Sequence, residues 1–406
     1  MLVFYTVESI NQIKPILSAG CIQSVFDGKE KMKNNNEPKL RYPEFTDAWE
    51  KCKLGDVIKF INGKAYKQEE LLDSGKYRVV RVGNFNTNEH WYYSDLELES
   101  DKYMTKGDLL YLWATDFGPR FWNGEKAIFH YHIWRLEVDY KILNKNYLYT
   151  WLETDKEKIK QSTNGTTMVH VTKSTMEKRL FLYPTLLEQQ KIGNLFKQLD
   201  RLITLHKRKW DDVILLKKAL LQKMFPKNGE RLPEIRFPEF QDNWQLCQLE
   251  TIVDVYSGRD YKHLSNGDIP VYGTGGYMLS VNEALSYHQD AIGIGRKGTI
   301  DKPYILTAPF WTVDTLFYTI PRKNYDLYFT FLLFQLINWK SKDESTGVPS
   351  LSKTTILKSL AICPSLPEQQ KIGTFFRRLD RLISHHQQQY EHYQLFKKAL
   401  LQQMFI

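Results

Sequence analysis

The chain has 406 residues, of which 42% are hydrophobic and 14% aromatic, enough apolar material for two or three compact domains. Lys and Arg (56) outnumber Asp and Glu (47), an excess that favours a polyanionic partner without proving one. No apolar run approaches the roughly 18 residues of a membrane span. Four scattered cysteines, none in a Cys-x-x-Cys pair, argue against a disulfide framework and a zinc site. We therefore expect an intracellular soluble protein with free thiols.

The first 31 residues lack the basic start and apolar core of a signal peptide. A polar stretch opens at Met32 and leads into the first repeated motif. We therefore expect residues 1–31 to form an extension outside the fold, a prediction that N-terminal mass spectrometry of the native protein can test.

Two motifs occur twice in the chain. Arg-Tyr-Pro-Glu-Phe, from Arg41 through to Trp49, matches Arg-Phe-Pro-Glu-Phe, from Arg236 through to Trp244. The segment 188–225 matches 368–405 at a constant offset of 180, and each copy opens with Glu-Gln-Gln-Lys-Ile-Gly. The chain is thus two units, each with an Arg-aromatic-Pro motif, a variable body and a closing segment.

Each closing segment is predicted to be one long helix, because apolar residues recur every three or four positions. Thr185 with Glu188 and Ser365 with Glu368 have the spacing of capping boxes at the two helix starts. A helix of this length spans roughly 57 Å, too long and one-sided to be stable alone, so we expect the two to form an antiparallel coiled coil.

His206 and His386 occupy the same position in the two copies, in the phase of the apolar seam. A polar pair that fixes the register of the helices is the favoured interpretation. A metal site or a pH sensor is the alternative.

The bodies have mixed patterns: residues 77–82 and 127–138 alternate as strands do, and residues 327–339 favour a buried helix. We predict five segments: an extension at 1–31, bodies at 32–187 and 226–367, and helices at 188–225 and 368–406. The bodies share little beyond their edges, such as Gly63-Lys64 with Gly258-Arg259 and a hydroxyl residue before Lys173 and Lys353.

These motifs and the two divergent bodies together resemble the specificity subunits of type I restriction-modification systems, and the likeness covers nearly everything after residue 37. The resemblance implies an α+β fold with two mixed α/β target recognition domains in a pseudo-two-fold arrangement, separated by two long antiparallel coiled-coil helices. Each body would then read one half of a split sequence in double-stranded DNA, and the helices would set the spacing.

The resemblance also implies partners. The helices would dock methyltransferase subunits, two of them, and through them restriction subunits, in a bacterial or archaeal cytoplasm. The positions expected on this partner-facing surface come from the start of each helix: Gln189, Gln190, Phe196, Gln369, Gln370 and Phe376. The chain itself would be non-catalytic, with S-adenosylmethionine, ATP and magnesium on the partner subunits.

Basic and aromatic residues mark the expected DNA contacts. In the second body, Arg296, Lys297 and Thr299 belong to a Gly-rich stretch similar to a recurrent segment of such recognition domains, and Arg259 follows Gly258. In the first body, basic and aromatic groups interleave over a short stretch. The candidates there, with the lysines that the two units share, are Lys64, Trp113, Arg120, Asn123, Lys126, His132, Arg135, Lys173 and Lys353. For Lys173 and Lys353, a solvated charge beside a turn is the alternative.

The sequence gives only weak support to a cofactor site, a metal site or a catalytic activity. Residues 293–298 match Gly-x-Gly-x-x-Gly, but a dinucleotide site requires a following helix, whereas Pro303 favours a turn or strand there. His130 and His132 share a face of the presumed strand but have no apparent third metal ligand. The sequence contains no adenine-methylation motif and no phosphate-binding loop. The rival interpretations are a stand-alone DNA-binding regulator and a coiled-coil scaffold that does not bind DNA.

Overall fold

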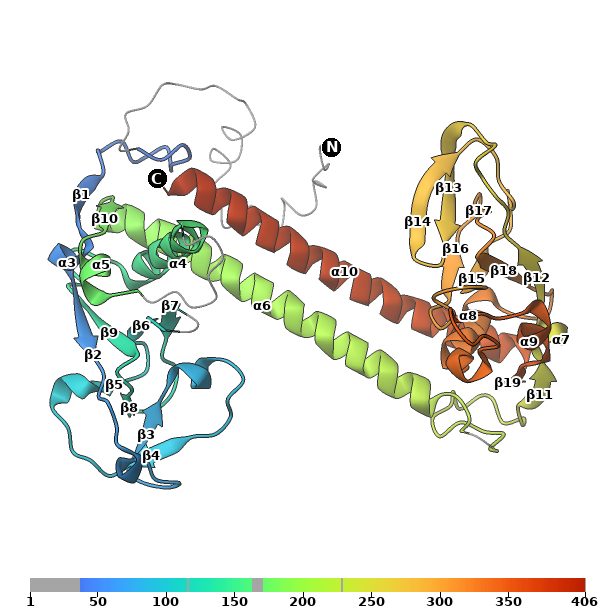
Figure 1. The fold of residues 1–406 in the computed structure, drawn as a ribbon, viewed down its shortest axis with the longest axis horizontal. Helices are drawn as coiled ribbons and strands as arrows, with labels where there is room; N and C mark the ends of the chain where they lie inside the picture. The colour runs from blue at the N-terminus through green and yellow to red at the C-terminus, as the bar shows by residue number, and fades with distance from the viewer. Residues whose placement is uncertain (1–36, 115–116, 163–170, 228, 406) are drawn as a thin grey trace. The chain divides into compact units, whose positions relative to one another are not determined.

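The computed structural model describes residues 37–114, 117–162, 171–227 and 229–405. The chain divides into two compact units, the first being Met1–Leu205 with Gln389–Ile406 and the second His206–Gln388. Each unit combines strands with helices, and Figure 1 labels the elements. The expected extension at residues 1–31, and Cys21 within it, lie outside the described residues. No described helix is both long enough and apolar enough to cross a bilayer.

The described residues of the first unit form three small sheets and the start of a long helix. Its strands pair in the orders β1-β10, β2-β9-β6-β7 and β4-β3-β8-β5. The strands are β1 (Glu50–Lys53), β2 (Ile58–Asn62), β3 (Tyr77–Val80), β4 (Tyr92–Ser94), β5 (Tyr103–Met104), β6 (Leu109–Leu112), β7 (Gly118–Phe121), β8 (Ala127–Phe129), β9 (Ile133–Val138) and β10 (Leu180–Tyr183). The helices are α3 (Leu54–Val57), α4 (Lys145–Ser162), α5 (Lys173–Glu177) and α6 (Leu186–Lys223), which continues into the second unit.

The second unit repeats this plan. Its strands pair in the orders β11-β19, β12-β18-β15-β16 and β14-β13-β17. The strands are β11 (Gln245–Gln248), β12 (Val253–Ser257), β13 (Asn266–Gly273), β14 (Gly276–Val281), β15 (Ala291–Gly295), β16 (Tyr304–Leu306), β17 (Trp311–Thr312), β18 (Leu316–Pro321) and β19 (Leu360–Cys363). The helices are α7 (Leu249–Ile252), α8 (Leu327–Leu336), α9 (Lys353–Lys358) and α10 (Leu366–Met404), whose last turns belong to the first unit.

The two bodies share the strand order of one four-stranded sheet, β2-β9-β6-β7 in the first and β12-β18-β15-β16 in the second, although their sequences diverge. The Gly63 N–H donates to the carbonyl oxygen of Ile133 at 3.3 Å, and the Gly258 N–H donates to that of Leu316 at 3.1 Å. Both glycines follow the edge strand of this sheet, β2 or β12, and both acceptors begin the strand beside it, β9 or β18. These matching bonds align β2, β9 and β6 with β12, β18 and β15.

The two long helices pair antiparallel inside each unit, as predicted. In the first unit, Phe196 of α6 lies 5.8 Å from Phe405 between ring centroids, and Asp200 accepts from Lys397 at 2.5 Å. Moving forward along α6 therefore means moving backward along α10. Each helix begins two residues before the predicted position.

The seam position contains the predicted polar pair. In the second unit the Nδ1 atoms of His206 and His386 lie 3.2 Å apart. Burial, more than neighbouring charge, lowers the pKa of both imidazoles. Among the residues that the structure describes, no three His, Cys, Asp or Glu side chains gather as metal ligands.

Each unit builds its core on aromatic side chains. Tyr147 and Phe196 are fully buried in the first unit, as are Trp244 and Phe329 in the second. Burying such a side chain contributes about 1.5 to 3 kcal/mol, so these positions stabilise each unit around its own helix start.

Two predictions about elements were wrong in detail. Residues 127–138 form two strands in different sheets, β8 and β9, because the chain turns at His130–His132, where the Ile133 N–H donates back to the His130 carbonyl at 3.0 Å. His130 and His132 therefore lie in a turn and do not share the face of a strand. The helix predicted at 327–339 ends at Leu336, with Trp339 in a following 3-10 turn. Cys52, Cys247 and Cys363 are free thiols.

Candidate nucleic-acid interface

A polar cleft of about 1010 Å³ opens in the second unit, beside the carboxyl end of β15. One wall comes from the ends of β12, β15 and β18, and the other from the segment that leads into α9. The lining residues are Ser257, Arg296, Lys297, Asp314, Thr315, Phe317, Glu344, Ser345, Thr346, Gly347, Val348, Ser350, Leu351, Ser352 and Lys353. Three of the predicted DNA contacts, Arg296, Lys297 and Lys353, thus share one cleft.

Backbone hydrogen bonds at the end of the sheet fix the positions of Arg296 and Lys297 in this cleft. The backbone N–H groups of Arg296 and Lys297 both donate to the carbonyl oxygen of Thr315, at 2.8 and 3.2 Å. The Arg296 guanidinium and the Lys353 ammonium lie 5.9 and 6.0 Å from the centre of the Phe317 ring. All three cationic residues are exposed to solvent. The cleft therefore presents positive charge around one aromatic ring, an arrangement suited to phosphates and base edges.

Two acidic residues lie in the same cleft. Asp314 offers its backbone carbonyl to Arg296 Nη1 at 3.3 Å, and the Glu344 carboxylate accepts from the Ser352 hydroxyl at 3.0 Å. Ser352 also caps α9, since its Oγ accepts the Thr355 N–H at 3.0 Å. The Asp314 backbone thus contacts the Arg296 guanidinium, and the Glu344 carboxylate contacts the residue that precedes Lys353.

Arg259 and Thr299 lie near the cleft without lining it. Gly258 is needed before Arg259 because a Cβ there would lie 2.0 Å from the Val313 carbonyl oxygen. The Arg259 side chain is exposed, and its carbonyl accepts the Trp311 indole N–H at 3.0 Å. Thr299 is half-buried in the turn after β15.

The Gly-x-Gly-x-x-Gly match does not form a dinucleotide site. Gly293 and Gly295 lie inside β15, and Gly298 forms the turn after it with a φ of 99°. The next element is the strand β16. The helix that such a site requires is therefore replaced by a strand, as the sequence predicted.

The first unit places Trp113 where the second places Arg296. The Trp113 N–H donates to the carbonyl oxygen of His132 at 3.2 Å, just as the Arg296 N–H donates to that of Thr315. No residue of 109–114 is identical to its counterpart in 292–297, so sequence comparison could not find this equivalence. The same backbone position thus carries an indole in one unit and a guanidinium in the other.

Aromatic rings surround Trp113. Its indole N–H donates to the Tyr131 carbonyl at 2.8 Å, its ring stacks on Trp134 at 5.9 Å, and His132 meets it edge-on at 4.8 Å. Burial, followed by the charge of His132, lowers the pKa of the nearby His130 to about 4. The His130 imidazole is therefore neutral at pH 7 and offers hydrogen bonds without positive charge.

Lys64 belongs to this aromatic site but already has a partner. Its backbone carbonyl accepts the Tyr131 N–H at 3.0 Å, which places it beside the ring cluster. Its ammonium lies 2.7 Å from the Glu70 carboxylate and 5.2 Å from the centre of the Tyr66 ring. Lys64 would therefore have to exchange Glu70 for a phosphate in order to contact DNA.

Lys173 lies at the same edge of the first unit. The Val171 N–H donates to the Trp113 carbonyl at 3.4 Å, and Lys173 follows at the start of α5. The Lys173 ammonium donates to the Phe60 carbonyl at 2.8 Å and lies 3.8 Å from Glu177. It is half-buried, whereas its counterpart Lys353 is exposed.

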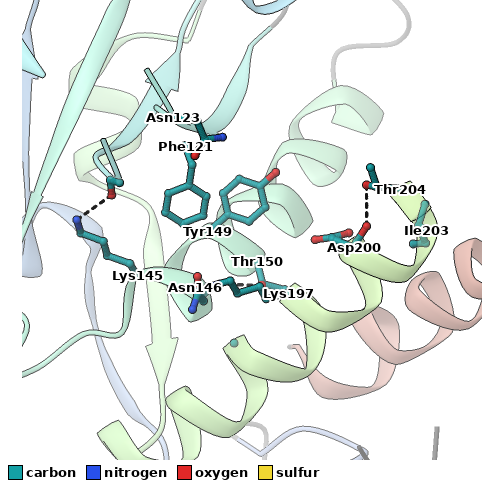
Figure 2. A pocket seen from close by; sticks show the side chains of 12 residues that line it. Phe121, Asn123, Lys145, Asn146, Tyr149, Thr150, Lys197, Asp200, Ile203 and Thr204 are labelled. Carbon is teal, nitrogen blue, oxygen red and sulfur yellow. Dashed lines mark hydrogen bonds between the residues drawn. The ribbon is translucent and has the colours of Figure 1, made fainter. Parts of the chain in front are cut away.

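Four further candidates of the first body lie elsewhere. Arg120 on β7 is 3.9 Å from Glu153 of α4. Lys126 lies over the Tyr103 ring at 4.1 Å, and Arg135 donates to the Asp101 carbonyl at 3.5 Å. Asn123 lines a groove beside α4 and α6, which Figure 2 shows. The structure thus gathers Lys64, Trp113, His132 and Lys173 and leaves these four apart.

Most of the expected partner-facing residues lie inside the units. Phe196 and Phe376 are fully buried, and Gln189 and Gln369 are nearly so. The Gln189 amide donates to Ile142 and Pro184 carbonyls at 3.0 and 2.8 Å, and its oxygen accepts the Asn144 N–H at 2.9 Å. These side chains therefore join each helix to its own body, whereas Gln190 and Gln370 face solvent.

The sequence did not reveal the role of the Arg-aromatic-Pro motifs. Arg41 donates to both oxygens of the Glu188 carboxylate at 2.8 Å, and Arg236 does the same to Glu368 at 2.7 Å. The predicted capping carboxylates, which are themselves buried, thus each hold an arginine. The signal was present, because an arginine and a glutamate recur together in both units.

A second ion pair completes each of these contacts. Lys191 pairs with Glu44, and Lys371 pairs with Glu239. The Lys191 ammonium also lies 5.3 Å from the centre of the Phe45 ring. The glutamates and the phenylalanine come from the Arg-aromatic-Pro motifs and the lysines from Glu-Gln-Gln-Lys-Ile-Gly. Each body is therefore bound to the first turns of its own helix by two sets of contacts.

The model of the type I restriction modification DNA specificity domain matches residues 46–214 and 241–392. Because these segments make up more than half of the chain, the chain belongs to this family of specificity subunits. Each matched segment contains one body and much of its closing helix.

Individual proteins agree with this family. The chain is 27% identical to the type I restriction enzyme MjaVIII specificity subunit of Methanocaldococcus jannaschii over 55% of this chain and 53% of that protein. It is 26% identical to the EcoBI specificity subunit of Escherichia coli over 38% of this chain and 34% of that protein. The chain thus spans about half, or less, of the length of these relatives.

A solved structure matches over most of its length. The crystal structure of the type I restriction-modification S subunit from M. genitalium has a TM-score of 0.69 at 19% identity, covering 91% of this chain and 99% of that one. This likeness shows the α+β fold, with two mixed domains and long paired helices.

Proposed function

We propose that this chain recognises a bipartite target in double-stranded DNA, with one half-site read by each unit. The observation that carries the proposal is the equivalent edge of the two sheets. It presents Arg296, Lys297 and Lys353 in the second unit and Trp113 with Lys173 in the first. A shared backbone with different side chains suits two readers of different sequences.

The cleft of the second unit would divide its contacts by chemistry. Lys297 and Lys353 would contact phosphates, which supply affinity and position. The Arg296 guanidinium, exposed beside the Phe317 ring, has the fork geometry for the O6 and N7 atoms of guanine. Arg296 is therefore the residue that we expect to specify a base.

The first unit would read its half-site with less charge. Trp113 and the neutral His130 offer apolar surface and hydrogen bonds to base edges, as thymine methyls and adenine edges require. Lys173 would contact a phosphate if it released the Phe60 carbonyl. We therefore expect weaker salt dependence from contacts of this unit than from those of the second.

The long helices would dock the methyltransferase subunits. Leu215 and Leu395, at the same position of the two repeats, are 67% and 65% exposed. Such exposed leucines on otherwise polar helix faces suit partner helices. Because Leu215 and Leu395 are equivalent, we expect two methyltransferase subunits to bind, one at each helix. Restriction subunits would bind through these methyltransferase subunits. Gln190 and Gln370 remain candidates on this surface.

In this proposal the chain catalyses no reaction of its own and works in the cytoplasm. Adenine methylation and ATP-dependent restriction, with their S-adenosylmethionine, ATP and magnesium, would belong to the partner subunits.

Co-expression with the methyltransferase subunit tests this function. We expect the two chains to purify together and to bind one split DNA sequence, with an affinity that falls steeply as salt rises. Tight sequence-specific binding by the purified chain, with no methyltransferase recovered, would indicate a stand-alone regulator. Absence of salt-dependent DNA binding by the assembled complex would indicate a scaffold and refute the proposal.

A further inference from the structure

A groove of about 690 Å³ lies in the first unit between β7, α4 and α6. Figure 2 shows Phe121 and Tyr149 side by side on one wall, and Asp200 and Thr204 on a facing stretch of α6. The Phe121 and Tyr149 rings stack at 5.0 Å. The groove thus combines an aromatic wall with a carboxylate, and the DNA contacts proposed above do not use it.

The second unit fills the same place with its own tyrosine. The Tyr328 hydroxyl donates to the Asp380 carboxylate. The Arg377 guanidinium lies 5.1 Å from the centre of the Tyr328 ring, and Phe331 meets that ring edge-on at 5.6 Å. An aspartate, a cation and an aromatic ring together hold this phenol.

Backbone contacts show which residue replaces Tyr328 in the first unit. The Asn144 N–H donates to Gln189 Oε1 at 2.9 Å, and the Asp326 N–H donates to Gln369 Oε1 at 3.1 Å. Two residues further along the chain, the first unit has Asn146 and the second has Tyr328. The groove is therefore open because an asparagine stands where its counterpart carries a tyrosine.

The three contacts of the tyrosine all have counterparts in the groove. Asp200, Lys197 and Tyr149 occupy the positions of Asp380, Arg377 and Phe331, and all three line the open space. Asp200 also accepts from Lys397 at 2.5 Å, as Asp380 accepts from Lys217 at 2.7 Å. Asp380 accepts hydrogen bonds from Lys217 and from the Tyr328 hydroxyl at the same time. Asp200 can therefore accept from Lys397 and from a second hydroxyl in the same way.

We propose that this groove receives a tyrosine side chain from a partner polypeptide, which takes the place that Tyr328 occupies in the second unit. The aromatic wall suits the ring, and the Asp200 carboxylate accepts its hydroxyl. A phosphorylated tyrosine is disfavoured, because its phosphate would meet the negative charge of Asp200. The inference rests on the proposed function only in requiring that the chain assembles with another protein.

A small probe tests the site without any partner. Saturation-transfer NMR on the full chain would measure binding of N-acetyl-tyrosinamide and N-acetyl-phenylalaninamide. We expect the tyrosine derivative to bind and the phenylalanine derivative to bind about tenfold more weakly, the loss expected for a hydrogen bond to a charged group. Equal binding of the two probes, or binding of neither, would overturn the proposal.

Filling the groove provides the second arm. Asn146→Tyr should abolish binding of the tyrosine probe while the thermal midpoint stays at or above that of the unsubstituted chain. Gln161→Tyr adds the same side chain at an exposed position of α4 and should leave binding intact. Unchanged probe binding in Asn146→Tyr would contradict the proposal. Neither experiment involves DNA or the methyltransferase. A negative result would therefore refute the tyrosine site and leave the proposed function untouched.

Discussion

The two units hold their long helices with the same side chains but present different side chains at the equivalent edge of their sheets. Arg41 with Glu188 and Arg236 with Glu368 form equivalent two-pronged ion pairs at the helix starts. At the edge of the sheets, by contrast, one unit has Trp113 where the other has Arg296. Repeated residues therefore form the contacts between each body and the start of its own helix, which we call the frame. The exposed surface, by contrast, varies on a common backbone.

The ion pairs at the helix starts offer the strongest test of this contrast. Arg41→Ala would leave Glu188, whose side chain is fully buried, without its cation. Losing one partner of such a pair costs about 3 to 5 kcal/mol. We expect Arg236→Ala to have a similar effect, and chemical denaturation measures both.

An exposed ion pair provides the control. Lys59 and Glu137 lie 3.5 Å apart with side chains 73% and 54% exposed. Lys59→Ala should change the free energy of unfolding by no more than about 1 kcal/mol. Equal losses in Arg41→Ala and Lys59→Ala would show that the buried pair does not hold the frame.

The glycine of the Glu-Gln-Gln-Lys-Ile-Gly motif is the second part of the frame. A Cβ on Gly193 would lie 2.7 Å from the backbone nitrogen of Tyr147, because α4 approaches α6 closely there. Gly193→Ala should destabilise the chain by about 1 to 3 kcal/mol. Gly275→Ala, whose Cβ would meet nothing within 4 Å, is the control. A Gly193→Ala variant as stable as this control would exclude close packing as the reason for the motif.

Substitutions in the cleft of the second unit should weaken DNA binding and leave the fold intact. Arg296→Ala should lower the affinity of the assembled complex by about tenfold to a hundredfold and relax the preference at one position of one half-site. Arg322→Ala, at the other end of β18 beside Asp254, should leave binding unchanged. Equal binding curves for both variants would remove Arg296 from the interface.

Protonation of the histidine pair, His206 and His386, should change the free energy of unfolding least among these tests. Burial lowers the pKa of His206 and His386 in the folded chain below the value of an unfolded histidine. The unfolded chain therefore binds more protons as pH falls below about 6.5, so stability is lost through that range and is present above it. Denaturation midpoints at pH 7.5 and 5.5 measure this loss.

A double variant isolates the contribution of this pair. His206→Gln with His386→Gln should narrow the difference between the two pH values. His288→Gln, at an exposed position outside the helices, should not. A pH dependence unaltered in the double variant would assign the effect to other groups.

The sequence was sufficient for the two long helices because the signals that predict them are local and repeated. Periodicity and repeats located both helices to within two residues, and the antiparallel pairing followed from their length. The break between β8 and β9 was missed because the apolar pattern runs through the turn at His130–His132. The equivalence of Trp113 and Arg296 was also missed, since it depends on backbone hydrogen bonds that leave no shared residues.

The candidate site was predicted least well in the first body. The interleaved basic and aromatic residues there are spread over different strands and the turns between them. Arg120 therefore lies beside Glu153 and Lys126 over the Tyr103 ring, both away from Trp113. Residues that line the cleft of the second unit, such as Thr315 and Phe317, carry no charge pattern that could have indicated them.

The most direct test of sequence recognition by this chain is to map N6-methyladenine across the genome, with and without this gene and with the partner genes intact. We expect deletion of the gene to remove methylation from one split sequence, and Arg296→Ala to alter methylation through one half of that sequence only. An unchanged methylation map after deletion would contradict this expectation.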